Sequence, residues 1–264
     1  MIDRPLGPLP LDAPIPGSSF SDLLQSMGLT APMNLPPGFS LPSVPEGTTV
    51  LALKDAEGVV MAGDRRATEG HLVAHRSIRK VFPADKFSAV AIAGTAGLAM
   101  DMVRLFQVEL EHYEKIEGVR LSLDGKASFL ARMVKGQLPM AMQGLIVVPL
   151  FAGYDEREAT GKVFTFDVVG GRYEETDFGS TGSGARLAKS YLRTSYEEGL
   201  SADTAIALAV NALVAASRED TATGGPDLLR RILPNVVRID AEGLVEVAEE
   251  VVFPLAEDAV EKVR

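Results

Sequence analysis

Few side chains in this sequence could act as a nucleophile beside a base. The chain has no cysteine, which excludes thiolate catalysis and a disulfide framework. Of its three histidines, His112 belongs to a charged helical face, and His71 and His75 flank a predicted strand without metal-ligand spacing. A histidine-based triad is therefore not indicated, and no zinc, EF-hand or P-loop pattern is present.

A threonine at a newly made N-terminus is one nucleophile that carries its own base. The α-amino group titrates close to neutral pH, so it can take the proton of the hydroxyl in the same residue. In Gly47-Thr48-Thr49, a cut before Thr48 would create that residue. Gly47 has no Cβ, which leaves its carbonyl open to attack. The other interpretation is a turn glycine followed by two β-branched strand residues.

Charged residues further along the chain could tune such a site. Asp64 and Arg66 end a predicted strand, and Lys80 follows 14 residues after Arg66. A partly buried lysine near the new terminus would favour a neutral amine and stabilise an alkoxide. Taken singly, each of these residues is better explained as a solvated charge, so the hypothesis depends on their occurring together. A glycine-rich stretch at 179–184 suggests a phosphate loop only weakly, because the Walker lysine is missing.

The elements that must position these residues begin after a proline-rich leader. Residues 1–47 hold 10 of the 16 prolines, a composition that does not fit the interior of a sheet. Within it, residues 19–27 predict one or two helical turns. The leader is interpreted either as a disordered tail or as a pro-segment that docks through Phe20, Leu23 and Leu24.

Residues 48–264 predict an α+β fold. Hydrophobic periodicity predicts strands at 49–54, 58–64, 72–81, 87–93, 145–154, 163–169, 172–176, 235–239 and 244–247. It predicts helices around 102–113, around 129–138, after Gly184, from an N-cap at Ser201, and near Pro254. Strands and helices come in groups and do not alternate, so we expect antiparallel sheets stacked between helical layers.

Composition limits the possible partners. The formal net charge is −10, which argues against nucleic-acid binding or attachment to anionic membranes. No apolar run is long enough to span a bilayer, and the first residues lack the features of a secretory signal. A cytoplasmic protein is therefore expected.

From residue 48 onward the chain resembles the 20S proteasome β subunit of the actinobacterial type, an N-terminal-nucleophile threonine peptidase. The resemblance is carried jointly by residues 47–50, 58–68, 78–81, 93–97, 182–184 and 220–225. It implies a four-layer αββα sandwich and a propeptide, residues 1–47, that is removed by autocatalytic cleavage between Gly47 and Thr48. It also implies a peptidase domain at 48–264 that needs no cofactor or metal.

The resemblance implies a role for each site residue. Thr48 is the nucleophile, and the residues around it are Asp64, Arg66, Lys80, Ser183, Asp220 and Thr223. Many relatives carry serine at the position of Thr223, where the hydroxyl is retained and the methyl group restricts its rotamers. The backbone N–H of Gly94 is the oxyanion donor. Thr68 and Ala96 lie on the strand edges that bind an extended peptide.

The resemblance also implies a specificity pocket and an assembly. The pocket is expected to be lined by Ala67, Ile78, Ile92 and Ala96, with Phe82 and Met100 at its margin. None of these is charged, so cleavage after apolar residues is expected. The implied partners are seven-membered α rings and other β subunits in a four-ring barrel, an ATPase ring, and tagged or unfolded protein substrates. The alternatives are a non-catalytic ring subunit, a two-ring bacterial peptidase and a binding domain with a disordered tail.

Overall fold

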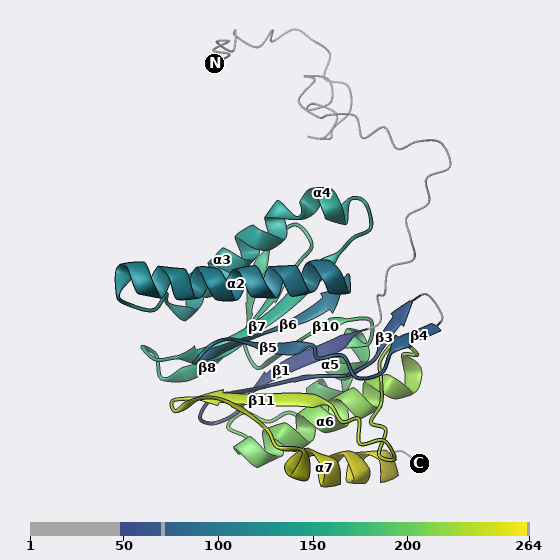
Figure 1. Cartoon of the computed structure of the whole chain (residues 1–264). Helices are drawn as coiled ribbons and strands as arrows, with labels where there is room; N and C mark the ends of the chain where they lie inside the picture. The colour runs from purple at the N-terminus through teal and green to yellow at the C-terminus, as the bar shows by residue number, and fades with distance from the viewer. Residues whose placement is uncertain (1–47, 70–71, 263–264) are drawn as a thin grey trace, which may run out of the picture. The chain divides into compact units, whose positions relative to one another are not determined.

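The computed structural model describes residues 48–69 and 72–262, which lie within one compact unit, Leu41–Arg264 (Figure 1). The expected leader, its helical turns at 19–27, Gly47 and His71 fall outside the described residues.

Two five-stranded antiparallel sheets form the centre of the fold. The first has the order β10-β1-β2-β11-β12, with β1 at Thr49–Lys54, β2 at Val59–Gly63, β10 at Phe178–Gly182, β11 at Asn235–Asp240 and β12 at Gly243–Glu246. The second has the order β5-β6-β7-β8-β9, with β5 at Val81–Asp85, β6 at Ser88–Gly94, β7 at Val147–Asp155, β8 at Thr160–Phe166 and β9 at Arg172–Glu175. A separate hairpin joins β3, Ala67–Glu69, to β4, Leu72–His75.

Helices cover the outer face of each sheet (Figure 1). Against the second sheet pack α2, Ala96–Glu117, and α3, Leu123–Gly136, which the short α4, Leu138–Ala141, follows. On the first sheet lie α5, Ala185–Ser195, and α6, Ala202–Glu219, with α7, Glu249–Glu261, packed on α6. The expected αββα sandwich is confirmed.

The strand sequences show why both sheets are covered on both faces. Along β1, Leu51 and Leu53 pack towards α6, whereas Val50 and Ala52 pack towards the second sheet. The four central residues of β1 are all apolar, which is the pattern of a strand that is buried on its two sides. Thr49, the first residue of this strand, therefore lies in the interior of the sandwich.

Helix α6 is the apolar helix expected from the sequence. Its N-cap is Ser201, whose side chain accepts a hydrogen bond from the backbone N–H of Thr204 at 3.3 Å. Its residues from Ala205 to Ala216 include nine buried ones, which pack beneath the first sheet. Core burial accounts for its composition.

One expected strand was wrong, and one strand was missed. The single strand expected at 72–81 is two strands in different sheets, because the exposed β4 ends at His75 and the chain bends before β5 begins at Val81. The guanidinium of Arg65 stabilises this bend by donating to the carbonyls of Ser77 and Ile78, each at 2.9 Å. The glycine-rich stretch at 179–184, for which a phosphate loop was only weakly suggested, is mostly strand β10, and no strand was expected there.

Candidate active site

Thr48 immediately precedes β1 and is buried, with 6% of its surface exposed. Its carbonyl oxygen accepts hydrogen bonds from Ser183, from the backbone N–H at 2.8 Å and from Oγ at 3.2 Å. The next residue, Thr49, pairs with Gly182 at the end of β10. The edge pairing of these two strands therefore fixes the position of Thr48 against the loop that leads into α5.

A buried ion pair lies on one side of this residue. Lys80, just before β5, places Nζ 2.5 Å from Oδ1 of Asp64, just after β2. Asp64 is fully buried, and it also accepts from the backbone N–H groups of Thr49 at 2.8 Å, Arg66 at 2.9 Å and Gly224 at 2.8 Å. Three backbone donors and one ammonium thus stabilise a carboxylate in the interior.

The environment of Lys80 lowers the pKa of its ammonium below the ordinary value of 10.5. Burial is the main cause, because it disfavours the charged form. The carboxylate of Asp64 opposes this effect, and the positive charge of Arg66 adds to it. A lysine in this state exchanges a proton more readily near neutral pH than a solvated lysine does.

A second polar network lies on the α5 side of Thr48. Asp220 Oδ2 accepts from Ser183 Oγ at 2.6 Å and from Thr223 Oγ1 at 2.5 Å. Thr49 Oγ1 joins the network, because it lies 2.5 Å from Thr223 Oγ1 and accepts from the backbone N–H of Gly184 at 2.9 Å. The role of Thr49 was missed from the sequence, where its strand position seemed to account for its β-branched side chain.

Arg66 connects the two sides of the site. Its backbone N–H binds Asp64, and its Nη1 donates to the carbonyls of Thr221 at 3.0 Å and Thr223 at 3.3 Å. We use the term polar cluster for Thr48, Thr49, Asp64, Arg66, Lys80, Ser183, Asp220 and Thr223. Seven of these eight residues were predicted from the sequence.

A small cavity of about 110 Å³ opens beside Thr48. The expected Ala67, Ile78, Ile92, Ala96 and Met100 all line it, together with Thr48, Lys80, Gly94, Ala99 and Arg79. Phe82 is not among the lining residues and instead packs on the core under α2. Thr68 is buried in β3, next to the lining residue Ala67. Ala96 is the first residue of α2, so the expectation that it lies on a strand edge was wrong.

The expectation that no charged residue lines this cavity needs a correction for Arg79 and Lys80. The guanidinium of Arg79 is engaged elsewhere, since Nη2 binds Glu246 at 2.9 Å and Nε donates to the carbonyl of Val81 at 3.0 Å. Lys80 is paired with Asp64. Both charges have partners outside the cavity, so its remaining wall is apolar.

Gly94 ends β6 and lines this cavity and a second one of about 200 Å³. Its φ of 110° is a conformation that favours glycine. A Cβ at this position would lie 2.1 Å from the carbonyl oxygen of Ile146. Any larger residue would therefore push the end of β6 away from Ile146.

The arrangement can support hydrolytic chemistry on a peptide. A buried hydroxyl-bearing residue lies between a lysine of lowered pKa and a hydrogen-bonded Ser–Asp–Thr network, with an apolar cavity beside it. Within residues 48–69 and 72–262, no three His, Cys, Asp or Glu side chains gather in a way that could hold a metal ion. In the same part of the chain, no helix is long and apolar enough to cross a membrane.

Comparisons with known proteins agree on one family. A family profile described as "Proteasome subunit" matches residues 44–227. A "Proteasome subunit beta" of Acidimicrobium ferrooxidans is 60% identical over 200 residues, which cover 76% of this chain and 73% of the relative. A "Proteasome subunit beta" of Streptomyces griseus is 48% identical over 263 residues, which cover 98% of this chain and 94% of the relative.

Proposed function

This chain belongs to the proteasome subunit family, and we propose that it is a catalytic β subunit of the proteasome core, a threonine endopeptidase. The observation that carries the proposal is the position of Thr48 between the buried Lys80–Asp64 pair and the Ser183–Asp220 network. A subunit that only builds a ring would not need a charge pair buried at the start of β1, because such pairs contribute little net stability.

The proposed nucleophile is the hydroxyl of Thr48, and the base is the amine that cleavage would free. In the first step the hydroxyl adds to the carbonyl carbon of Gly47, and the Gly47–Thr48 peptide bond breaks as the nitrogen becomes an amine. Water then hydrolyses the resulting ester, which leaves a carboxylate on Gly47 and a free N-terminal Thr48. Residues 1–47 are thus proposed to be a propeptide, and residues 48–264 the peptidase domain.

After cleavage the same groups would act on substrate. The amine of Thr48 takes the hydroxyl proton. The positive charge of the Lys80 ammonium favours the neutral form of that amine and stabilises the developing alkoxide. Asp64 and Arg66 hold Lys80 and the 221–223 loop in place. The backbone N–H of Gly94 is proposed to bind the oxyanion, since no side chain blocks access to it.

The cavity beside Thr48 is proposed to bind the substrate side chain on the acyl side of the cleaved bond. Its wall is formed by Ala67, Ile78, Ile92, Ala96 and Met100. Because the charges of Arg79 and Lys80 have other partners, an acidic or basic substrate side chain would lose hydration without gaining an ion pair. We expect faster cleavage after Leu or Tyr than after Arg or Glu, which a panel of fluorogenic peptides would measure.

The family places this chain in a proteasome core with other subunits. The finer picture belongs to the proposal: seven-membered α rings outside paired β rings, an ATPase ring that delivers tagged or unfolded proteins, and a cytoplasmic location. Enclosure in such a chamber would separate an unspecific peptidase from other proteins.

Intact mass of the assembled particle tests the proposal. The expected species begins at Thr48, whereas Thr48→Ala should retain residues 1–47 and show no peptidase activity. Asp22→Asn, which changes the leader without touching the polar cluster, is the matched control and should be cleaved normally. A Thr48→Ala chain that is still trimmed at Gly47 in pure form would refute self-cleavage. A wild-type chain that stays uncleaved and inactive in the particle would favour the non-catalytic ring subunit.

A further inference from the structure

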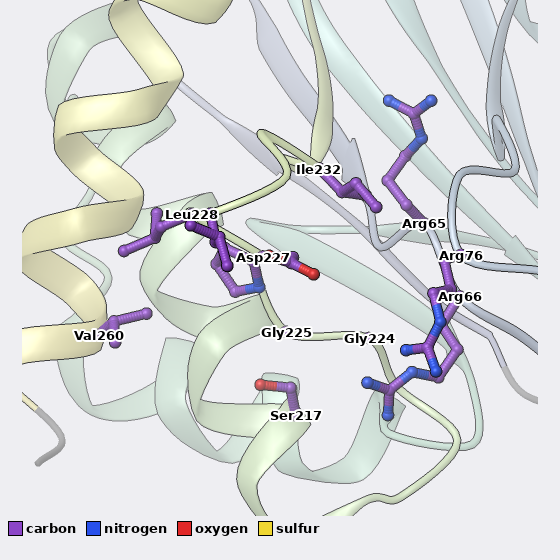
Figure 2. A pocket seen from close by; sticks show the side chains of 12 residues that line it. Arg65, Arg66, Arg76, Ser217, Gly224, Gly225, Asp227, Leu228, Ile232 and Val260 are labelled. Atoms are coloured by element: carbon purple, nitrogen blue, oxygen red, sulfur yellow. The ribbon is translucent and has the colours of Figure 1, made fainter. Parts of the chain in front are cut away.

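A larger cavity, of about 610 Å³, lies beside the polar cluster and is lined by three arginines (Figure 2). Arg65, Arg66 and Arg76 form one wall, and the loop that contains Gly224 and Asp227 lies across from them. Arg66 belongs both to this cavity and to the polar cluster. We call this cavity the arginine pocket.

The positive charge of the arginine pocket has little compensation. Arg65 and Arg66 bind backbone carbonyls, which satisfy their N–H groups without cancelling their charge. Arg76 is exposed and makes no hydrogen bond or ion pair with another residue of the described chain. Among the described residues that line the pocket, Asp227 carries the one carboxylate, and its Oδ2 pairs with Arg230 Nη1 at 2.8 Å. The positive electrostatic potential of the pocket would therefore favour the binding of a carboxylate ligand.

The arginine pocket lies close to the point where the described chain begins. The carboxylate of Asp64 binds the N–H of Thr49 through Oδ1 at 2.8 Å and the N–H of Arg66 through Oδ2 at 2.9 Å. A single carboxylate group thus separates the start of β1 from the backbone of Arg66. Arg66 is thus the residue that connects the pocket to the surroundings of Thr48.

The leader offers one carboxylate at the right place in the sequence. Glu46 is the only acidic residue between Asp22 and Thr48. Two extended residues span at most about 7 Å, so Glu46 lies within that distance of Thr48 before the reach of its own side chain is added. On the pocket side, the backbone of Arg66 lies one carboxylate group away from the N–H of Thr49, which places the arginine wall within reach of the Glu46 side chain.

We infer that, in the uncleaved chain, the arginine pocket binds the carboxylate of Glu46 and thereby orients the Gly47–Thr48 bond for attack by the hydroxyl of Thr48. This inference rests on the proposed self-cleavage. Glu46 is a positioning residue: it touches no reacting atom, and it acts by restricting the conformations of the bond that breaks. It leaves with the leader, so its effect is confined to processing.

The test compares cleavage rates of variants on both sides of the proposed contact. Glu46→Gln and Arg76→Gln remove one charge each and should slow cleavage about fivefold, as expected for loss of a partly exposed charge pair. Asp22→Asn and Arg104→Gln, which remove charges from the distant leader and from exposed α2, are the matched controls. Uncleaved particles are isolated, and the appearance of the Thr48 terminus is followed by intact mass.

Two further measurements separate a specific contact from a general effect. The Glu46→Gln/Arg76→Gln double variant should be no slower than the slower single variant, because both changes break the same contact. Glu46→Arg should slow cleavage further, and adding Arg76→Glu should restore part of the rate. Mature particles from Glu46→Gln should equal wild type in peptidase activity, since their chains are identical.

The inference is overturned if Glu46→Gln is cleaved at the wild-type rate, if the two single effects multiply in the double variant, or if native gels show that the variants slow assembly and not cleavage within assembled particles. Each of these results leaves the proposed function intact, because the wild-type chain would still be cleaved at Gly47. Failure of the proposed function is seen separately, as a wild-type chain that is never cleaved or a Thr48→Ala chain that is.

Discussion

Replacing Lys80 by methionine is the sharpest test of the buried ion pair. The change removes the ammonium and keeps most of the side-chain volume. Asp64 is then left fully buried, with its three backbone donors and no counter-charge. Breaking a buried pair costs about 3–5 kcal/mol. We expect the lower end, about 3 kcal/mol, because the three N–H groups remain and because the lowered pKa of Lys80 shows that its own charge is costly there.

A second buried pair provides the matched control. Lys126 of α3 pairs with Asp85 at the end of β5, and Asp85 also accepts from the N–H of Phe87 and from Ser88 Oγ. The side chains of Lys126 and Asp85 are 5% and 16% exposed. Lys126→Met should therefore destabilise the fold by a similar amount, about 2–3 kcal/mol. It should leave peptidase activity unchanged, because this pair lies outside the polar cluster.

Urea unfolding of the full-length chain and fluorogenic peptide turnover of the assembled particle give the two readouts. A loss of 3 kcal/mol corresponds to a fall in Tm of roughly 6–12 °C for a domain of this size. Lys80→Met should also reduce peptidase activity at least about 100-fold, the scale of a lost acid–base group. Activity within twofold of wild type would refute the role given to Lys80. A change in unfolding free energy below about 1 kcal/mol would refute the argument from burial.

Further predictions concern other groups of the site. Gly94→Ala should lower the unfolding free energy by about 3 kcal/mol, because its Cβ would meet the carbonyl of Ile146; an unchanged urea midpoint would contradict this. Thr49→Val should cost about 2 kcal/mol in the same assay, because it leaves the buried N–H of Gly184 without its partner and removes the hydrogen bond to Thr223 Oγ1. Ala96→Val should reduce the turnover of peptides cleaved after Tyr about tenfold relative to peptides cleaved after Ala, since the added methyl groups fill a cavity of about 110 Å³. A Tyr-to-Ala turnover ratio equal to that of wild type would contradict the assignment of that pocket. Burial lowers the pKa of Lys80 in the folded chain below the ordinary value of 10.5. At pH values between the folded pKa and 10.5, the unfolded chain therefore binds more protons at Lys80 than the folded chain does. Stability from this group should rise with pH across that window, and titrated unfolding of Lys80→Met should lack the rise.

The strands that are buried on both faces could be predicted well from the sequence. The expected strand at 49–54 agrees with β1, because its unbroken apolar run is bounded by Lys54 and the turn after it. The strand expected at 72–81 failed because its break depends on distant residues. Arg65 donates to two carbonyls in the bend, and this contact leaves no trace in the periodicity of residues 72–81. Propensity describes a segment, whereas a bend of this kind is set by tertiary contacts.

The site shows the same division between local pattern and tertiary contact. Asp64 and Lys80 are 16 residues apart, and each could be named as a candidate, but neither spacing nor composition could show that they form a buried pair. The contribution of Thr49 was hidden because a β-branched residue at the start of a strand needs no further explanation. The shared role of Arg66 in the polar cluster and the arginine pocket is likewise visible only in three dimensions.

The glycines of strand β10 weaken its sequence pattern, and one of them is needed to form the site. Glycine disfavours strands, so the stretch that ends β10 reads as a loop. Gly182 is nevertheless required at its position, because a Cβ there would lie 2.0 Å from the carbonyl oxygen of Thr48 and its φ is 102°. That close approach lets the next residue, Ser183, place its N–H 2.8 Å from the same oxygen. A larger residue at 182 would move the strand away from Thr48 and separate it from the Asp220 network, so the residue that weakens the strand signal is the one that brings the two halves of the site together.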